Sequence, residues 1–97
     1  MAWHRNYSGS YTNDIITKVD GRFVLACFTV RHMPEWTSPD RWAVEATWKR
    51  EDGTESSLVT LSDAPARTFA EAKRTAFALA AGGFRFHPGL GFCAEVK

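Results

Sequence analysis

Two Asp-Gly dipeptides, Asp20-Gly21 and Asp52-Gly53, constrain the fold of this chain more than any other feature of its sequence. Asp and Gly both tolerate positive φ angles, so this dipeptide is favoured in the two-residue loops of β-hairpins. β-forming residues flank each dipeptide on both sides. The sequence therefore predicts two antiparallel hairpins, one over residues 11–31 and the other over residues 41–61.

The first hairpin contains a strand that is apolar on both of its faces. A two-residue loop places Ile16 opposite Leu25. The strand after the loop reads FVLACFTV over residues 23–30. Such a run is typical of a strand inside a sheet that is covered on both sides. We expect the second face to be covered by the tail of the chain, by Trp3 or by a second copy of the chain.

The second hairpin alternates strictly between apolar and polar positions. One face of its first strand carries Trp42, Val44, Ala46 and Trp48. A two-residue loop at Asp52-Gly53 pairs Trp48 with Ser57 and Ala46 with Val59, so that apolar faces meet. We therefore expect both tryptophans on the buried face of the sheet, near its two ends and beneath a helix.

One amphipathic helix follows the hairpins. Thr68 and Glu71 have the spacing of a capping box, in which each side chain satisfies a backbone N–H at the helix start. The helical pattern ends at Gly82-Gly83, because glycine readily adopts the left-handed conformation that terminates helices. The apolar stripe that should face the sheet consists of Phe69, Ala72, Ala76, Leu79 and Ala80.

The tail contains two short extended segments, residues 84–86 and 92–96, and we expect at least one of them to join the sheet. Strands precede the helix instead of alternating with it, which favours the α+β class. The prediction is a four- to five-stranded antiparallel sheet of two hairpins, packed on one α-helix in the C-terminal half, in the order β-β-β-β-α-(β). Residues 1–10 are expected to form a flexible N-terminal arm and residues 11–97 a single domain.

The overall composition limits the classes of function. The formal net charge is +1 over 97 residues, whereas a dedicated nucleic-acid-binding protein usually has a strong basic excess. No signal peptide or membrane-spanning run is evident, so we expect a cytoplasmic protein with no membrane partner. Two cysteines, Cys27 and Cys93, are too few for a disulfide scaffold. We expect both thiols to be reduced. If the protein is exported, a Cys27–Cys93 disulfide remains the alternative.

No residue pattern points to a metal, a cofactor or a catalytic centre. The residues of metal-ligating type are His4, His32, Glu35, His87 and the two cysteines, and none shows the short paired spacing of zinc sites. Cys27 lies in the most apolar strand, where we expect a buried hydrophobic residue instead of a nucleophile. No Gly-rich phosphate loop is recognisable. We therefore expect no metal, no cofactor and no enzymatic activity.

A loop rich in interface-favoured residues is the first candidate binding site. Residues 34–41 carry Trp36 between two prolines, and the candidate partner-binding set is Arg31, His32, Met33, Trp36 and Arg41. Loops on a rigid sheet often carry binding function, and Trp, Met and Arg are enriched at interfaces. The alternative is that Trp36 folds back and covers an open end of the core.

Basic residues around the helix are the second candidate site. Arg67, Lys73, Arg74 and Arg85 are candidates for contact with nucleic-acid phosphates. Acidic residues at positions 71 and 95 dilute this charge. The alternative is an ordinary solvated helix face.

The order of strands and helix over residues 11–82 resembles known compact units. Together, Asp20-Gly21, Asp52-Gly53 and the Thr68–Glu71 helix start resemble double-stranded-RNA-binding domains and the partner-binding domains of HicB-type antitoxins. The chain also resembles small uncharacterised single-domain proteins of proteobacteria. RNA-binding domains of that type carry a lysine run at the helix start, whereas this chain reads DAPARTFAEAKR there. No functional residue of either family is therefore carried over.

These observations lead to an ordered set of hypotheses. The first is a small non-enzymatic protein–protein interaction domain with an unidentified protein partner or a second copy as partner. It would bind through residues 34–41 or through an exposed sheet edge, as in strand addition. The alternative is a nucleic-acid-binding module that uses aromatic stacking and the basic residues. A small enzyme comes third.

Overall fold

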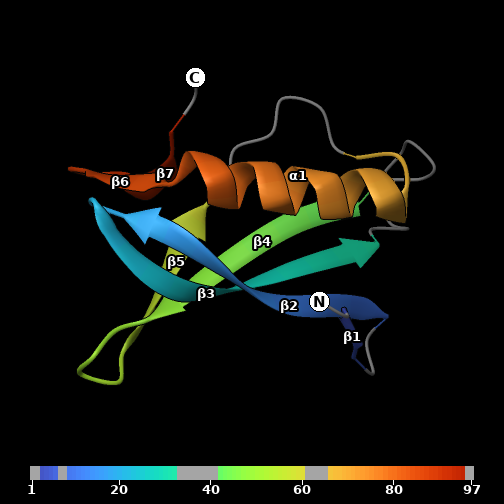
Figure 1. Ribbon diagram of the computed structural model, residues 1–97, viewed down its shortest axis with the longest axis horizontal. Helices are drawn as coiled ribbons and strands as arrows, with labels where there is room; N and C mark the ends of the chain where they lie inside the picture. Colours follow the sequence, from blue (N-terminus) through green and yellow to red (C-terminus); the bar gives the residue numbers. More distant parts are fainter. Residues whose placement is uncertain (1–2, 7–8, 33–41, 61–65, 96–97) are drawn as a thin grey trace.

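A strongly curved sheet wraps around one face of a single helix (Figure 1). The computed structural model describes residues 3–6, 9–32, 42–60 and 66–95. The elements within these ranges are β1 (His4–Arg5), β2 (Ser10–Val19), β3 (Arg22–His32), β4 (Trp42–Lys49), β5 (Glu55–Val59), α1 (Phe69–Gly82), β6 (Phe84–His87) and β7 (Gly91–Ala94).

The β2–β3 hairpin has the predicted loop and register. Asp20 and Gly21 adopt φ angles of 50° and 80°, as a two-residue loop of the favoured type requires. Ile16 pairs with Leu25 across the hairpin. The Asp-Gly dipeptide therefore correctly predicts both the position and the alignment of these two strands.

The predicted register of the β4–β5 hairpin is wrong by one residue. Ala46 pairs with Leu58 and Trp48 with Ser56. The Arg50 N–H donates to the Thr54 carbonyl at 2.8 Å, and Gly53 has a φ angle of 89°. This is a three-residue loop with one glycine in the left-handed region, the next commonest hairpin connection. The extra loop residue shifts every pair in the hairpin by one position.

The helix begins and ends where the capping residues predict. The Thr68 hydroxyl accepts from the Glu71 N–H at 3.1 Å, which satisfies one of the free donors at the helix start. Glu71 in turn accepts from the Arg67 N–H at 2.8 Å. Gly83 ends the helix with a φ angle of 84° and donates its N–H to the Leu79 carbonyl. The buried helix positions Ala72, Ala76 and Ala80 allow close approach to the sheet.

The tail forms a hairpin that completes the sheet in a way the sequence did not predict. β6 and β7 pair with each other antiparallel, whereas each pairs with an earlier strand in parallel. Val59 of β5 aligns with Cys93 of β7. Val19 of β2 aligns with Phe84 of β6, and this last pair closes the sheet on itself.

The fold class is therefore a correction to the sequence prediction. The described residues form a closed six-stranded mixed barrel and one helix, instead of an open four- to five-stranded antiparallel sheet packed on a helix. Parallel pairing requires a long crossover between strands, and α1 provides it between β5 and β7. Closure also satisfies backbone groups that an open sheet would leave at its two edges.

The core lies between the concave face of the sheet and α1. Phe28 is fully buried there, and its ring centroid is 6.3 Å from that of Phe84. Trp42 stacks on Phe69 of the helix at 5.3 Å. Trp48 packs edge-on against Phe92 of β7 at 5.4 Å. Both tryptophans are half-buried on the inner face, where Trp42 contacts the start of the helix through Phe69 and Trp48 packs against the core.

Part of the expected N-terminal arm is attached to the domain. β1 pairs with β2, with His4 opposite Thr12. The Trp3 ring meets the Phe77 ring of α1 edge-on at 6.1 Å. Trp3 therefore packs against the helix and does not cover the outer face of β3.

Candidate functional site

Three large apolar side chains project from the outer face of the β2–β3 hairpin. Ile16 is 65% exposed, Phe23 75% and Leu25 60%. Ile16 lies directly opposite Leu25 on the neighbouring strand. Phe23 is two residues before Leu25 and therefore lies on the same face of β3. We call Ile16, Phe23 and Leu25 the hairpin patch. Single exposed apolar residues are ordinary, whereas adjacent ones commonly mark a binding surface.

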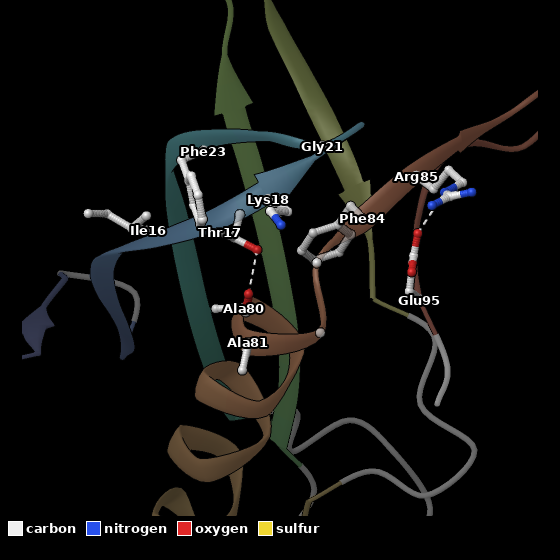
Figure 2. Close-up of a pocket in the computed structure, with 12 residues that line it drawn as sticks. Ile16, Thr17, Lys18, Gly21, Phe23, Ala80, Ala81, Phe84, Arg85 and Glu95 are labelled. Atoms are coloured by element: carbon white, nitrogen blue, oxygen red, sulfur yellow. Dashed lines mark hydrogen bonds and ion pairs between the residues drawn. The ribbon is translucent and has the colours of Figure 1, made fainter.

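The inner face of the same hairpin explains why the patch is outside. Along β2, Ile15, Thr17 and Val19 are buried, and the residues between them are exposed. The Thr17 hydroxyl donates to the Ala80 carbonyl at the end of α1, at 2.7 Å (Figure 2). A slip of one residue would bury the charged side chains of β2 and lose this hydrogen bond. The register that builds the core therefore also holds the hairpin patch in solvent.

A hollow of about 560 Å³ lies between the hairpin and the end of α1. Phe23 and Lys18 line it from the hairpin, and Ala81 and Phe84 line it from the other side (Figure 2). A second hollow of about 390 Å³ lies toward β4 and includes Trp48 in its lining. Phe23 lines both hollows, so it forms a ridge between two depressions.

Charged residues flank the hairpin patch in a definite order. Along the outer face of β2, Asp14, Ile16 and Lys18 succeed one another, and all three are exposed. The Lys18 ammonium lies 5.1 Å from the centroid of the Phe23 ring. Within the described ranges, no ion pair involves Asp14 or Lys18. Both charges are exposed on the same face as the hairpin patch.

Cys27 lies next to the patch but has an environment unsuited to a nucleophile. It is half-buried, instead of fully buried as its strand suggested, and it pairs with Asp14 across the hairpin. Burial raises the pKa of the Cys27 thiol above its ordinary value of 9.0, and the Asp14 charge raises it further. The neutral thiol is thereby favoured, and the thiolate is the reactive form. Cys93 is buried, and both thiols are free.

The residues predicted to bind a partner lie at the other end of β3 from Phe23, or outside the described residues. Arg31 forms an ion pair with Glu45 at 2.6 Å. His32 is exposed, and its ring is 5.2 Å from that of Trp42. Met33, Trp36 and Arg41 lie outside the described residues, as does the metal-type residue Glu35.

The four basic candidates are spread along the helix instead of being gathered on one surface. Arg67 precedes α1 and Arg85 follows it, and a helix of 14 residues is about 21 Å long. Arg85 forms an ion pair with Glu95 at 2.7 Å. The Lys73 ammonium lies 4.5 Å from the centroid of the Phe69 ring, and Arg74 is exposed.

Across residues 3–6, 9–32, 42–60 and 66–95, no group of three or more His, Cys, Asp or Glu side chains is arranged to hold a metal ion. Within the same ranges, no helix has the length and apolar character needed to cross a membrane.

The hairpin patch was absent from the sequence-based site predictions, although one signal pointed to it. The sequence of β3 is apolar on both faces, and that pattern is typical of a strand covered on both sides. The pattern alone does not separate a covered face from an exposed one. That distinction required the positions of β6, β7 and Trp3.

Comparison with models of protein families, with curated proteins and with solved structures finds no match to this chain. The resemblance drawn from the sequence also assumed an open antiparallel sheet, which the closed mixed barrel replaces.

Proposed function

We propose that this chain is a small, non-enzymatic protein–protein interaction domain whose binding face is the hairpin patch. The observation that carries the proposal is the exposure of Ile16, Phe23 and Leu25 on adjacent positions of one strand pair. Fully burying a side chain of this size contributes about 1.5–3 kcal/mol. A partner that covered all three would gain a substantial part of a specific binding energy.

The rigidity of the hairpin supports this assignment. Val19 and Thr17 attach β2 to β6 and to α1, directly behind the patch. The Asp20 carboxylate accepts from the Phe86 N–H at 2.9 Å and so holds the tip of the hairpin. A preorganised surface loses little conformational entropy when it binds.

The chemistry of the neighbouring ionisable groups favours binding over catalysis. The raised pKa of Cys27 disfavours its reactive form. Hydrogen bonds from the Thr54 side chain and backbone lower the pKa of Asp52, which lines the second hollow. A general acid or base works best with a pKa near neutral pH, and this shift moves Asp52 away from it.

Affinity capture with a matched pair of leucine variants tests the proposal. Leu25 lies in the patch, and Leu90 is 70% exposed in the turn between β6 and β7. We expect wild type and Leu90→Ser to retain the same bound proteins, the chain itself included, and Leu25→Ser and Phe23→Ser to lose them. Equal recovery by all four proteins would contradict the proposal.

A further inference from the structure

The outer face of the first half of β3 is left without a cover by the described segments of the chain. The tail, which was one candidate cover, is used to close the barrel. Trp3, the second candidate, packs on Phe77 of α1. Phe23 and Leu25 remain largely exposed. Within the described residues, the tail strands and Trp3 therefore do not cover this face, and the remaining cover expected from the sequence is a second copy of the chain.

The charges around the patch are self-complementary. Asp14 and Lys18 stand on either side of Ile16 along the outer face of β2. A two-fold axis that crosses both strands at the Ile16–Leu25 pair reverses the strand direction in the second copy. Lys18 then lies over Asp14 of the second copy, and the same contact recurs on the other side of the axis. An axis parallel to the strands and midway between them would instead place Lys18 over Phe23 and Asp14 over Cys27 of the second copy, with no ion pair.

We infer that two copies of this chain pack the outer faces of their β2–β3 hairpins together, antiparallel and about a two-fold axis through the Ile16–Leu25 pair. Ile16 and Leu25 meet their counterparts, and Phe23 lies over Cys27 of the second copy. This is an isologous interface, in which one surface is complementary to itself. The inference rests on the proposed function, because it names the partner of the same face.

The size of this face predicts a dissociable dimer. Six residues on two strands face the partner: Asp14, Ile16, Lys18, Phe23, Leu25 and Cys27. A stable interface buries about 1,000 Å² or more in total, and a face of this size lies near or below that limit. We therefore expect dimers at high protein concentration and monomers on dilution.

Charge reversal combined with sedimentation equilibrium tests the arrangement, from micromolar to near-millimolar protein. Asp14→Lys places lysine over lysine, and Lys18→Asp places aspartate over aspartate, each at two symmetric positions. Because exposed ion pairs are individually weak, we expect each single variant to raise the dimer Kd about tenfold. The double variant Asp14→Lys/Lys18→Asp restores opposite charges and should regain the wild-type Kd. Arg74→Glu, an exposed reversal on α1, is the matched control and should leave the Kd unchanged.

The double variant keeps the test independent of folding, because loss of the fold in a single variant would not be repaired by a second reversal. If a dimer forms and its Kd is the same for wild type and both single variants, the proposed arrangement is wrong. A strict monomer at near-millimolar concentration would overturn the dimer. If Leu25→Ser still abolished capture of another protein in that case, the proposed function would stand and only this inference would fail. If capture were also insensitive to the patch, both would fail.

Discussion

The two hairpins share the dipeptide Asp-Gly and yet form different loops. In the first, Asp20 and Gly21 both have positive φ angles and the loop has two residues. In the second, Gly53 has a positive φ angle, and the loop has three residues. Asp52 accepts hydrogen bonds from the backbone and the hydroxyl of Thr54, at 2.9 and 2.6 Å. The local bond to Thr54 therefore accompanies the longer loop.

The two aspartates also connect their hairpins to the rest of the molecule differently. The Asp20 carboxylate accepts a hydrogen bond from the backbone of β6, whereas the hydrogen bonds of the Asp52 carboxylate to described residues are to Thr54 of its own loop. The β4–β5 loop accordingly projects away from α1 (Figure 1), and residues 51–55 are all exposed. The same dipeptide thus serves a tertiary contact in one hairpin and a local one in the other.

The largest expected effect is a difference in stability between variants on the inner and outer faces of the first hairpin. Phe28→Ala empties a fully buried position and should lower the free energy of unfolding by about 3–5 kcal/mol. Phe23→Ala, in the same strand, removes an exposed ring and should change it by less than about 0.5 kcal/mol. Urea denaturation of both variants measures the difference. Similar losses for the two would refute the assignment of inner and outer faces.

A smaller effect tests how the first hairpin is attached to the helix. Thr17→Val keeps the shape of the side chain but leaves the Ala80 carbonyl without its hydroxyl donor. We expect a loss of about 1–2 kcal/mol in the free energy of unfolding. Thr47→Val, on the half-buried outer side of β4, is the control and should change stability by less than about 0.5 kcal/mol. The attachment is not as described if the control loses as much.

Alanine substitutions at the two aspartates test the comparison of the loops directly. Asp20→Ala loses the bond to β6 and places alanine at a positive φ angle, so we expect a loss of about 1–2 kcal/mol. Asp52→Ala loses only local bonds in a fully exposed loop, and its loss should be smaller. Thermal and urea unfolding rank the two variants. The reverse ranking would show that the tertiary bond of Asp20 contributes little.

The smallest effect is a pH dependence that belongs to the second hairpin. Hydrogen bonds from Thr54 lower the pKa of Asp52 below its ordinary value of 3.8 in the folded state. A lowered folded pKa contributes stability that is present above the unfolded pKa and is lost as pH falls through the folded one. The stability difference between wild type and Asp52→Ala should therefore shrink below about pH 3.8. Urea unfolding at a series of acid pH values measures it, and a constant difference would contradict the cause assigned to the shift.

The features that sequence analysis predicted correctly are local in the chain. The first hairpin depends on Asp20-Gly21 and on strand alternation within about ten residues on either side. The helix bounds depend on Thr68, Glu71 and Gly83, which act on backbone groups within one turn. The predicted register of the second hairpin is wrong because Asp52-Gly53 is compatible with both a two-residue and a three-residue loop. The observed three-residue loop contains the hydrogen bond between Asp52 and Thr54.

The candidate site was missed for a different reason. Ile16, Phe23 and Leu25 read as core residues, because large apolar side chains in strands are usually buried. The sites that were predicted relied on residue types favoured at interfaces, such as Trp36 and Arg41, without knowledge of which surfaces were free. Residue type alone does not report solvent exposure, which depends on every segment that packs nearby.

By itself, the sequence determined the two strand pairs, the helix and its ends, and the inward faces of β2, β3 and β4. The inward face of β5 depended on the loop of the second hairpin, because its register is one residue from the predicted one. Backbone preferences and side-chain periodicity act over a few residues, and they suffice for these features. Only the tertiary structure decided that β6 and β7 close the sheet through parallel pairing. The sequence of a short strand does not indicate which distant strand it pairs with. The pairing of β6 and β7 therefore depends on where the end of α1 places them. That closure commits the tail elsewhere and leaves the hairpin patch exposed.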